Sequence, residues 1–495
     1  MASVESTNSV SNNSASEVSK ANEVSTKTEN KSSVVSEPLS AENSSAGTMS
    51  KVGELGTSGE AMKARLNGSL NKTEAVAPPD LTTEASVTRT GGKTIIDAGA
   101  GDDRIAITED AKTGAVTVNV NGAESVFKGS DRDNLVIRAG EGNDNIAVGE
   151  NVTVKLTLEG QDGDDRITVS DKVSTGQVIE GGAGRDTIIG GGGMDYINGS
   201  TGDDFIMGRG GNDVIYAGDG DDYVSGGDGD DYLEGGKGND TVRGWNGNDN
   251  ISGGQGDDSL YGGDGNDVLY AGEGKDKIYG QTGDNKVFSQ TEDTVDANSA
   301  TVTNTVVEID MTDAIGSSVV INGSDEFKQR IEQDLDMLRS SPVGREMLAA
   351  WDNTGHTVTI NEFDQQNGTA RPTNGINTSF DTANQKPGRT DDATFNINPD
   401  FYPADHIPPI VVFYHEGAHA LDYMQGTLRT DIYGGNDGGD HGIKDAERVA
   451  VGLPIDHDKD PSTPEIVAPE HPQNLTENAL RDELNRQLRP RYRAF

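Results

Sequence analysis

A nine-residue repeat fills the middle of the chain and restricts its fold more than any other feature. The repeat runs without a gap from GGAGRDTII at 181–189 to GQTGDNKVF at 280–288. Its sixth position is aspartate in every copy except the last, which has Asn285, and its eighth position is always aliphatic. Glycines suit turns with positive φ, and an aliphatic residue at a fixed place suits a buried strand. The repeat therefore predicts a parallel β-roll with two copies per turn.

The aspartates of the repeat predict a series of calcium sites. With two copies per turn, aspartates two copies apart stack in two ladders, and stacked carboxylates repel unless a hard cation lies between them. The pattern resembles the calcium-binding nonapeptide of the RTX family of secreted bacterial proteins. We expect several structural Ca²⁺ ions between the turns, bound by Asp186, Asp195, Asp204, Asp213, Asp222, Asp231, Asp240, Asp249, Asp258, Asp267 and Asp276.

The segment before the repeats divides into two parts. Looser copies occur at 98–106, 139–147 and 160–168, between stretches that alternate apolar and polar residues. Alternation indicates strands, so we expect an irregular β-solenoid over 91–180 that leads into the RTX β-roll at 181–290. Residues 1–90 are rich in Ser, Thr, Asn and Glu and poor in aromatics. Such a composition favours disorder, and an unfolded export signal is our hypothesis for it.

Composition limits the partners of the chain. Asp and Glu number 84 against 40 Lys and Arg, which gives a formal net charge of −44. This charge disfavours nucleic acid and anionic membranes as partners. There is no cysteine to form a disulfide. We expect no transmembrane segment, because no apolar run approaches the roughly 20 residues that span a bilayer, and no cleaved signal peptide, because the first residues lack its basic and apolar regions.

A domain of a different kind is expected at 311–495, after a polar linker at 291–310. Four apolar residues share one face of a helix predicted to begin directly after Ser324, a suitable N-cap. Pro342 opens a second predicted helix. HTVTINEF at 356–363 alternates as a strand does, and LTENALRDELNRQL at 475–488 has helical spacing. These patterns predict a compact α+β domain.

The stretch FYHEGAHALDY at 413–423 has the spacing of a zinc site. On a helix, His415 and His419 lie one turn apart and face the same way, so both imidazoles can bind one Zn²⁺. Glu416 beside them can take a proton from water as a general base. Pro409 and Gly426 suit the start and the end of such a helix. The sequence therefore predicts one catalytic zinc.

A catalytic zinc needs a third protein ligand. The metzincin pattern puts Gly and His where this chain has Asp422 and Gln425, which disfavours a serralysin-like enzyme. We expect Glu447 as the third ligand, with His441 as the alternative, and Asp422 as a residue that orients a histidine. Tyr433 and Tyr492 are candidates for stabilising an oxyanion. The histidines expected to be ordinary surface or core residues are His356, His406, His457 and His471.

The last third of the chain resembles the NleD-type effector metallopeptidases. The resemblance rests on INGSDEFKQRIEQDLDMLRSSPVGREML, HEGAHALDYMQG, ERVAVGLPIDHDKDPSTP and LTENALRDELN, within about 315–495. It implies a gluzincin-like zinc metalloendopeptidase with His415 and His419 as ligands and Glu416 as base. It further implies type III secretion into host cells and cleavage of host signalling proteins, of which MAP kinases are the known class. Typical members are short and lack a calcium roll.

The sequence therefore supports two alternative hypotheses for the function. The first is a secreted zinc endopeptidase, an effector with a calcium-binding β-roll. The alternative is a calcium-dependent adhesin or binding module whose peptidase-like domain is inactive. The secretion machinery is also open: RTX proteins suggest type I export, but those proteins usually end in a secretion signal after the repeats. Here the basic RPRYRAF closes the peptidase domain instead, so we expect type III delivery.

Overall fold

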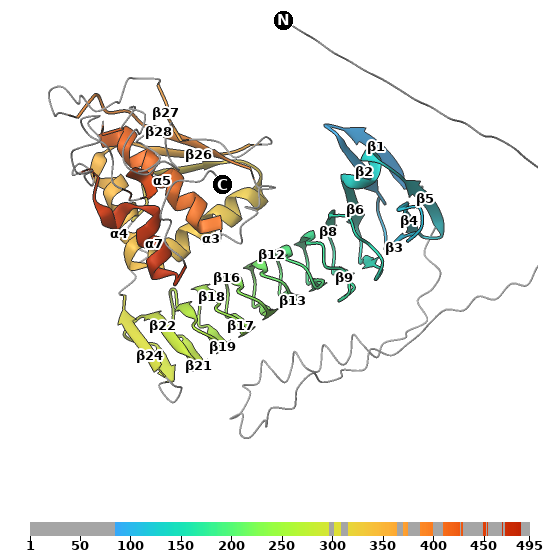
Figure 1. Ribbon diagram of the computed structural model, residues 1–495, viewed down its shortest axis with the longest axis horizontal. Helices are drawn as coiled ribbons and strands as arrows, with labels where there is room; N and C mark the ends of the chain where they lie inside the picture. The colour runs from blue at the N-terminus through green and yellow to red at the C-terminus, as the bar shows by residue number, and fades with distance from the viewer. Residues whose placement is uncertain are drawn as a thin grey trace, which may run out of the picture. The chain divides into compact units, whose positions relative to one another are not determined.

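The protein consists of a long β-roll followed by a domain of helices and strands (Figure 1). The structure is a computed structural model that describes residues 85–296, 301–307, 315–363, 370–374, 387–398, 409–425, 427–428, 449–451, 453, 468 and 471–486. All of these residues fall within one compact unit of the chain. Residues 1–84, most of the segment expected to be disordered, lie outside the described residues.

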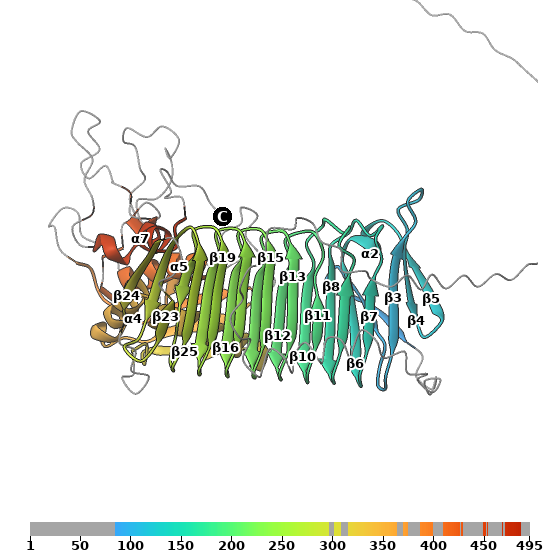
Figure 2. The same cartoon turned by 90° about the horizontal axis from the view of Figure 1, so that it is seen from below.

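The roll has two long sheets whose strands follow one another in alternation (Figure 2). From β6 onward each strand pairs in parallel with the strand two places along the chain, so that Ile197 lies beside Ile215. This confirms the predicted parallel β-roll. The first sheet contains, in spatial order, β1 (Ser86–Thr90), β2 (Lys93–Asp97), β6 (Leu135–Glu141), β8 (Leu156–Asp162), β10 (Val178–Ala183), β12 (Tyr196–Thr201), β14 (Val214–Asp219), β16 (Tyr232–Lys237), β18 (Asn250–Gln255), β20 (Val268–Tyr270), β22 (Asp284–Ser289) and β24 (Thr301–Val306).

The second sheet faces the first and runs through the same turns. At its N-terminal end the strands β3 (Arg104–Glu109), β4 (Val116–Val120) and β5 (Ala123–Phe127) pair antiparallel and close the roll. The short helix α2 (Ser130–Asp133) follows them. The strands, in spatial order, are β23 (Thr294–Asp296), β21 (Lys277–Thr282), β19 (Ser259–Asp264), β17 (Thr241–Asn246), β15 (Tyr223–Asp228), β13 (Phe205–Gly210), β11 (Thr187–Ile189), β9 (Arg166–Val169), β7 (Asn145–Val148), β3 (Arg104–Glu109), β4 (Val116–Val120) and β5 (Ala123–Phe127).

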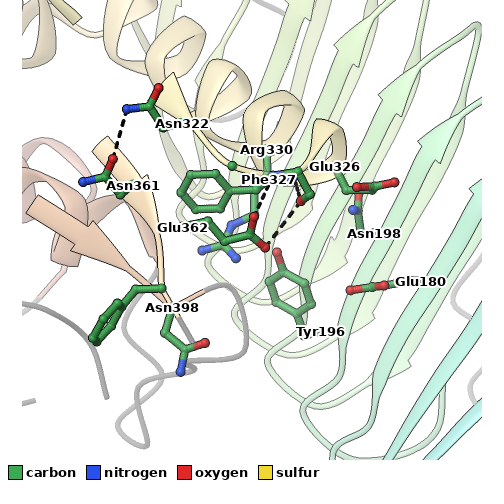
Figure 3. Close-up of a pocket in the computed structure, with 13 residues that line it drawn as sticks. Glu180, Tyr196, Asn198, Asn322, Glu326, Phe327, Arg330, Asn361, Glu362 and Asn398 are labelled. Atoms are coloured by element: carbon green, nitrogen blue, oxygen red, sulfur yellow. Dashed lines mark hydrogen bonds between the residues drawn. The ribbon is translucent and has the colours of Figure 1, made fainter. Parts of the chain in front are cut away.

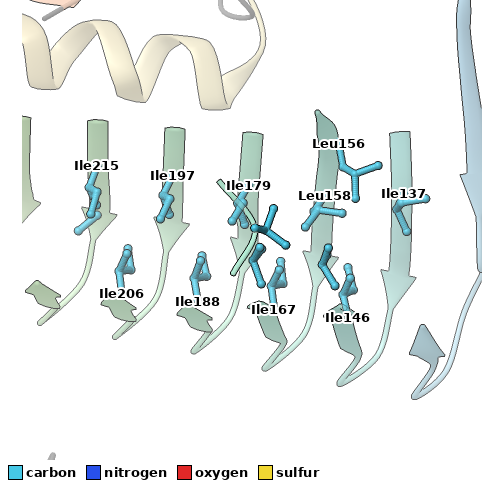
Figure 4. Close-up of a cluster of buried hydrophobic side chains, with 14 of the residues drawn as sticks. Ile137, Ile146, Leu156, Leu158, Ile167, Ile179, Ile188, Ile197, Ile206 and Ile215 are labelled. Carbon is cyan, nitrogen blue, oxygen red and sulfur yellow. The ribbon is translucent and has the colours of Figure 1, made fainter. Parts of the chain in front are cut away.

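The core of the roll is the ladder of aliphatic residues from the eighth repeat position. Side chains such as Ile188 and Ile206 from one sheet and Ile197 and Ile215 from the other point inward and meet (Figure 4). All four are fully buried. Because one aliphatic residue per copy suffices, the core stays narrow and the turns can stack closely.

The roll is longer at both ends than the sequence indicated. Strand β1 begins at Ser86, inside the segment expected to be disordered, and pairs antiparallel with β2. Strands β23 and β24 lie where a polar linker was expected, and each continues its sheet in parallel. Val295 and Val302 pack against the aliphatic core. Their apolar contacts explain why these polar segments form strands.

The C-terminal domain has helices around a four-stranded sheet, which confirms the α+β prediction. Ser324 accepts a hydrogen bond from the Phe327 N–H and caps the first helix, and Ser341 caps the second, with Pro342 at its start. The sheet order is β25 (Val319–Asn322), β26 (Val358–Glu362), β28 (Ala393–Ile397) and β27 (Arg371–Pro372). The helices are α3 (Asp325–Ser340), α4 (Pro342–Thr354), α5 (Pro409–Gln425), the 3₁₀ helix η1 (Gln473–Leu475) and α7 (Glu477–Glu483).

Helix α3 packs on the outer face of the first sheet of the roll. Tyr196, Tyr216 and Tyr232 from successive strands belong to the same apolar cluster as Phe327 and the rest of the domain core. The buried Tyr216 hydroxyl donates to Asp334 on α3 at 3.0 Å. The roll is thus part of the packing of the C-terminal domain. Among the described helices, none is long and apolar enough to cross a membrane.

Candidate functional site

Helix α5 brings the two histidines of the HEGAH motif to one side. His415 and His419 are both buried, and their ring centroids lie 4.9 Å apart with planes at 89°. Between them, Gly417 lets α4 approach: the Trp351 Nε1–H donates to the Gly417 carbonyl at 3.2 Å. A Cβ on Gly417 would lie 2.6 Å from Trp351 Cζ2. Packing against α4 therefore requires the smallest residue at this position.

Glu477, on α7, holds the ring of His415. Its Oε2 lies 3.0 Å from His415 Nδ1, and its Oε1 accepts from Arg481 Nε at 2.5 Å. All three side chains are buried. A carboxylate can only accept, so His415 donates through Nδ1. The neutral ring then has its lone pair on Nε2, where a metal ion can bind. Pairing of a ligand histidine with a carboxylate is common at zinc sites. This arrangement therefore fits zinc.

Glu416 lies next to His415 and is partly exposed. Its Oε2 accepts from the Ala370 N–H at 2.7 Å, and the Ala370 carbonyl accepts from the Tyr423 hydroxyl at 2.8 Å. The backbone just before β27 thus holds the predicted base against α5. A carboxylate fixed in this way can receive a proton without a large movement.

Asp422, one turn beyond His419, is fully buried. It bonds to His471, which was expected to be an ordinary surface or core histidine. His471 Nδ1 lies 2.9 Å from Asp422 Oδ1, and Thr427 Oγ1 donates to the same oxygen at 2.6 Å. Burial acts to raise the pKa of Asp422, but His471, Thr427 and His419 outweigh it and lower that pKa. Asp422 is therefore an anion that holds the ring of His471, and His471 belongs to the polar network at the end of α5.

The third zinc ligand stays a prediction. Glu447 and the alternative His441 lie outside the described residues, as do Tyr433 and Tyr492. Within the described ranges no cluster of three or more His, Cys, Asp or Glu side chains is arranged to hold a metal. Of the other histidines expected to be ordinary, His356 lies 3.2 Å from Asp392, and the remaining two, His406 and His457, are not described.

The repeat aspartates form two continuous ladders of hydrogen bonds. From Asp204 onward, the Oδ1 atom of each aspartate accepts the N–H of the aspartate 18 residues earlier. Examples are the bonds from Asp204 to Asp222 at 2.7 Å and from Asp213 to Asp231 at 2.8 Å. Ten of the eleven Oδ2 atoms are buried and have no hydrogen-bond partner in the described part of the chain. The exception is Asp195 Oδ2, which accepts from the Gly191 N–H at 2.6 Å. A series of buried carboxylate oxygens without donors is what a cation site requires.

The surroundings of these oxygens also fit calcium. A Cβ built on Gly235 would lie 2.6 Å from Asp240 Oδ2 and 2.5 Å from the Gly253 carbonyl oxygen of the next turn. Two acceptor oxygens thus face a small space that no side chain fills. In the last turn Asn285 replaces the aspartate, and its Nδ2 donates to the Gly280 carbonyl at 2.7 Å. The side-chain amide of Asn285 is itself a donor, which an ionised aspartate at this position cannot be.

Burial makes the ladder costly to ionise without a cation. It raises the pKa of Asp222 to about 7, that of Asp249 to about 8 and that of Asp204 to about 9. Neighbouring carboxylates contribute, after burial, to the raised pKa values of Asp204 and Asp249. A bound divalent cation would favour the ionised form and remove this cost.

A separate polar pocket of about 680 Å³ lies between the roll and the C-terminal domain (Figure 3). Tyr196 of the roll and Arg330 and Glu362 of the domain line it, and the Arg330 guanidinium lies 5.5 Å from the centre of the Tyr196 ring. None of the HEGAH residues lines it. The pocket is therefore distinct from the candidate peptidase centre.

Comparison with known families agrees with this division of the chain. Residues 315–492 match the sequence model of the Peptidase_M91 family, described as an effector protein. Four stretches, 175–206, 198–233, 225–260 and 252–287, match the RTX calcium-binding nonapeptide repeat. The chain joins a Peptidase_M91 effector domain to RTX repeats. No curated protein matches it. The M91 match supports a peptidase, and the RTX match implies that the roll binds calcium.

Sequence reasoning missed two residues of the M91 domain, Glu477 and His471. Glu477 stands 62 residues after His415 and His471 stands 49 residues after Asp422. The only local signal for Glu477 is its place at the start of an apolar helical pattern, where an acidic residue is ordinary. Only the packing of α7 against α5 shows what it contacts.

Proposed function

We propose that the C-terminal domain is a zinc endopeptidase. The observation that carries the proposal is the pair of buried histidines on α5, one of them held through Nδ1 by the buried Glu477, with Glu416 between them. Two such imidazoles are the usual core of a catalytic zinc site. Glu447 or His441 would complete the set. Zinc, when bound, supplies a Lewis acid that activates water and polarises the scissile carbonyl.

In this proposal, residues of the chain transfer the proton and position the groups around the metal site. Glu416 takes the proton of the attacking water and passes it to the leaving amine, as a general base and then a general acid. The Ala370 N–H keeps its carboxylate in place for both transfers. Glu477 keeps the tautomer of His415, and Asp422 fixes His471 nearby. Burial of Glu477, Asp422 and His471 excludes bulk water around them and strengthens their interactions.

The substrate we propose is a protein of a host cell. The description of the M91 family as an effector supports this class, and the resemblance to NleD-type enzymes favours a signalling protein such as a MAP kinase. Secretion, with type III delivery into the host cell, follows from the same resemblance. The RTX repeats also support a secreted protein.

The role we propose for calcium is to fold the roll. The two ladders contain eleven aspartates, and ten of their Oδ2 atoms lack donors among the described residues. The calcium-free roll must therefore bury either uncompensated carboxylate charges or protonated carboxyl groups. Binding of calcium would then contribute directly to the free energy of folding. The roll would remain poorly folded until calcium is plentiful.

A peptide library tests the proposed activity. The purified full-length protein, stripped of metal and then given zinc and calcium, should cleave library peptides, and Glu416→Gln should cleave none while still binding zinc. Glu326→Gln, at an exposed position on α3, is the matched control and should cleave as the wild type does. Cleavage that survives Glu416→Gln would refute the assigned base. Absence of both zinc binding and cleavage in the wild type would favour the alternative function, a calcium-dependent adhesin or binding module with an inactive peptidase-like domain.

A further inference from the structure

We propose that the calcium ladder extends upstream of the matched repeats, to Asp165, Asp144 and Asp103. These residues lie outside the stretches that match the RTX repeat, which begin at residue 175. They also lie outside the eleven aspartates predicted from the regular repeat. The proposal rests on hydrogen bonding, on burial and on the space beside one of the carboxylates.

The three upstream aspartates continue one ladder without interruption. The Asp165 N–H donates to Asp186 Oδ1 at 2.8 Å, Asp144 to Asp165 at 2.7 Å and Asp103 to Asp144 at 2.6 Å. The contacts join residues 21, 21 and 41 apart, whereas the regular turns join residues 18 apart. Longer connections between turns therefore interrupt the regular spacing of the looser repeat copies but leave the stacking intact.

The upstream carboxylates, like those of the regular turns, each have a buried oxygen without a hydrogen-bond donor among the described residues. Asp103, Asp144 and Asp165 expose only 6%, 2% and 3% of their surface, and the Oδ2 atom of each is buried without a hydrogen-bond partner among the described residues. Beside Asp165, a Cβ on Gly160 would clash with both Asp165 Oδ2 and the carbonyl oxygen of Gly181. The same pair of acceptor oxygens occurs in the regular turns, so a hard divalent cation such as Ca²⁺ fits here too.

Calcium counting on the full-length protein tests this extension. Asp165→Asn and Asp144→Asn should each lower the number of calcium ions bound per chain at saturation, measured by equilibrium dialysis with radioactive calcium. Asparagine should preserve the fold, because Asn285 already occupies the equivalent place in the last turn. Asp162→Asn, an exposed neighbour in β8, is the control and should leave the count unchanged. Equal calcium counts in all variants would overturn the proposal.

A separate set of contacts carries a second inference, which rests on the proposed peptidase function. We infer that α7 makes the position of His415 depend on the folded roll. The Tyr270 hydroxyl in β20 donates to Glu483 Oε1 at 2.8 Å, and Lys286 Nζ in β22 donates to the Asp482 carbonyl at 2.7 Å. Both acceptors lie at the C-terminal end of α7.

The other end of the same short helix holds the peptidase centre. Glu477 begins α7 and bonds His415, while Glu483 ends it. Leu480 between them is fully buried. Glu483 also accepts from Ser341 Oγ at 2.5 Å, at the cap of α4. Two roll side chains and α4 thus fix seven residues of helix, and that helix fixes a predicted zinc ligand.

Tyr270 connects the aspartate ladders to α7. Tyr270 lies between Asp267 and Asp276, one aspartate from each of the two ladders. Its ring stacks on Phe288 of the next turn with centroids 4.9 Å apart. If calcium orders these turns, it orders the strand that presents the hydroxyl to Glu483. Glu477 and Glu483 are therefore positioning residues whose alignment requires the roll.

Zinc affinity, measured by competition with a fluorescent zinc chelator, tests the coupling independently of activity. Tyr270→Phe in the full-length protein should weaken zinc binding roughly 10-fold, the lower end of the effect of losing a group that orients a ligand. Removing calcium with a chelating resin before zinc is restored should weaken it in the wild type as well. The matched control is Tyr279→Phe, in β21 of the opposite sheet, which should change neither zinc nor calcium binding.

The outcomes separate this inference from the function on which it rests. Unchanged zinc affinity in Tyr270→Phe and in calcium-free wild type, with cleavage that still depends on Glu416, would overturn the coupling alone. A wild type that neither binds zinc nor cleaves peptides would overturn the proposed function itself. Restored zinc binding in Tyr270→Phe at high calcium would also count against a role for the hydroxyl.

Discussion

At the residue scale, the peptidase centre depends on which groups are buried together. His415, Glu477 and Arg481 form a chain of hydrogen bonds out of reach of water. Buried charges of this kind are stable only while each keeps its partner. The arrangement around α5 is therefore sensitive to changes that preserve shape but remove a charge.

Replacing Glu477 by Gln should lower zinc affinity by about 10- to 100-fold, because the neutral amide no longer fixes the tautomer of His415. Peptidase activity should fall with zinc occupancy and recover partly at high zinc concentration. Zinc titration against a chelator measures the affinity, with Glu326→Gln as the control. An unchanged affinity would show that Glu477 has no effect on the metal site.

Replacing Gly417 by Ala should destabilise the C-terminal domain by about 1–3 kcal/mol, the usual cost of overpacking a core. The added methyl group would lie 2.6 Å from Trp351 Cζ2. Thermal unfolding followed by differential scanning calorimetry measures the effect. In a Trp351→Phe background the same change should cost less, because the smaller ring leaves room. Equal costs in both backgrounds would contradict this explanation.

At the element scale, the sequence predicted whole helices well and their partners poorly. Ser324 and Ser341 are caps, and Pro342 starts α4, because local chemistry alone selects these positions. The aspartate ladder also followed from a local period. The upstream aspartates and Glu477 did not, because irregular connections and long separations in the chain hide their contacts.

Replacing Ser324 by Ala should destabilise α3, and with it the contact between the roll and the domain, by about 1 kcal/mol. The variant loses the bond from the Phe327 N–H to Ser324 Oγ at 3.1 Å. Urea unfolding with calcium present gives the free energy, and Ser324→Thr should lose less. A Ser324→Ala variant as stable as the wild type would mean that the N-cap contributes little here.

At the scale of the whole molecule, calcium and pH act on the same set of carboxylates. In the calcium-free fold, burial raises the pKa of Asp222 to about 7 and that of Asp249 to about 8, above the ordinary value of 3.8. Between about pH 4 and about pH 8, the folded roll therefore binds more protons than the unfolded chain does. Its stability should therefore fall as pH rises from about 4 to about 8.

Calcium should reverse this dependence. Without calcium the roll should keep its β circular-dichroism signal near pH 5 and lose it near pH 8. With millimolar calcium it should be folded at pH 8, because the ionised carboxylates then have a partner. Thermal unfolding of the full-length protein at both pH values measures this. A calcium-free roll that is more stable at pH 8 than at pH 5 would contradict the account.

The most direct test of the central claim compares new protein N-termini in host-cell lysate treated with the wild type or with Glu416→Gln. Each protein is added with calcium, or after calcium has been removed and zinc retained. We expect new termini with the wild type alone, in greater number when calcium is present, and these termini would identify the substrates. Identical termini for the wild type and Glu416→Gln in both conditions would contradict a peptidase centred on α5.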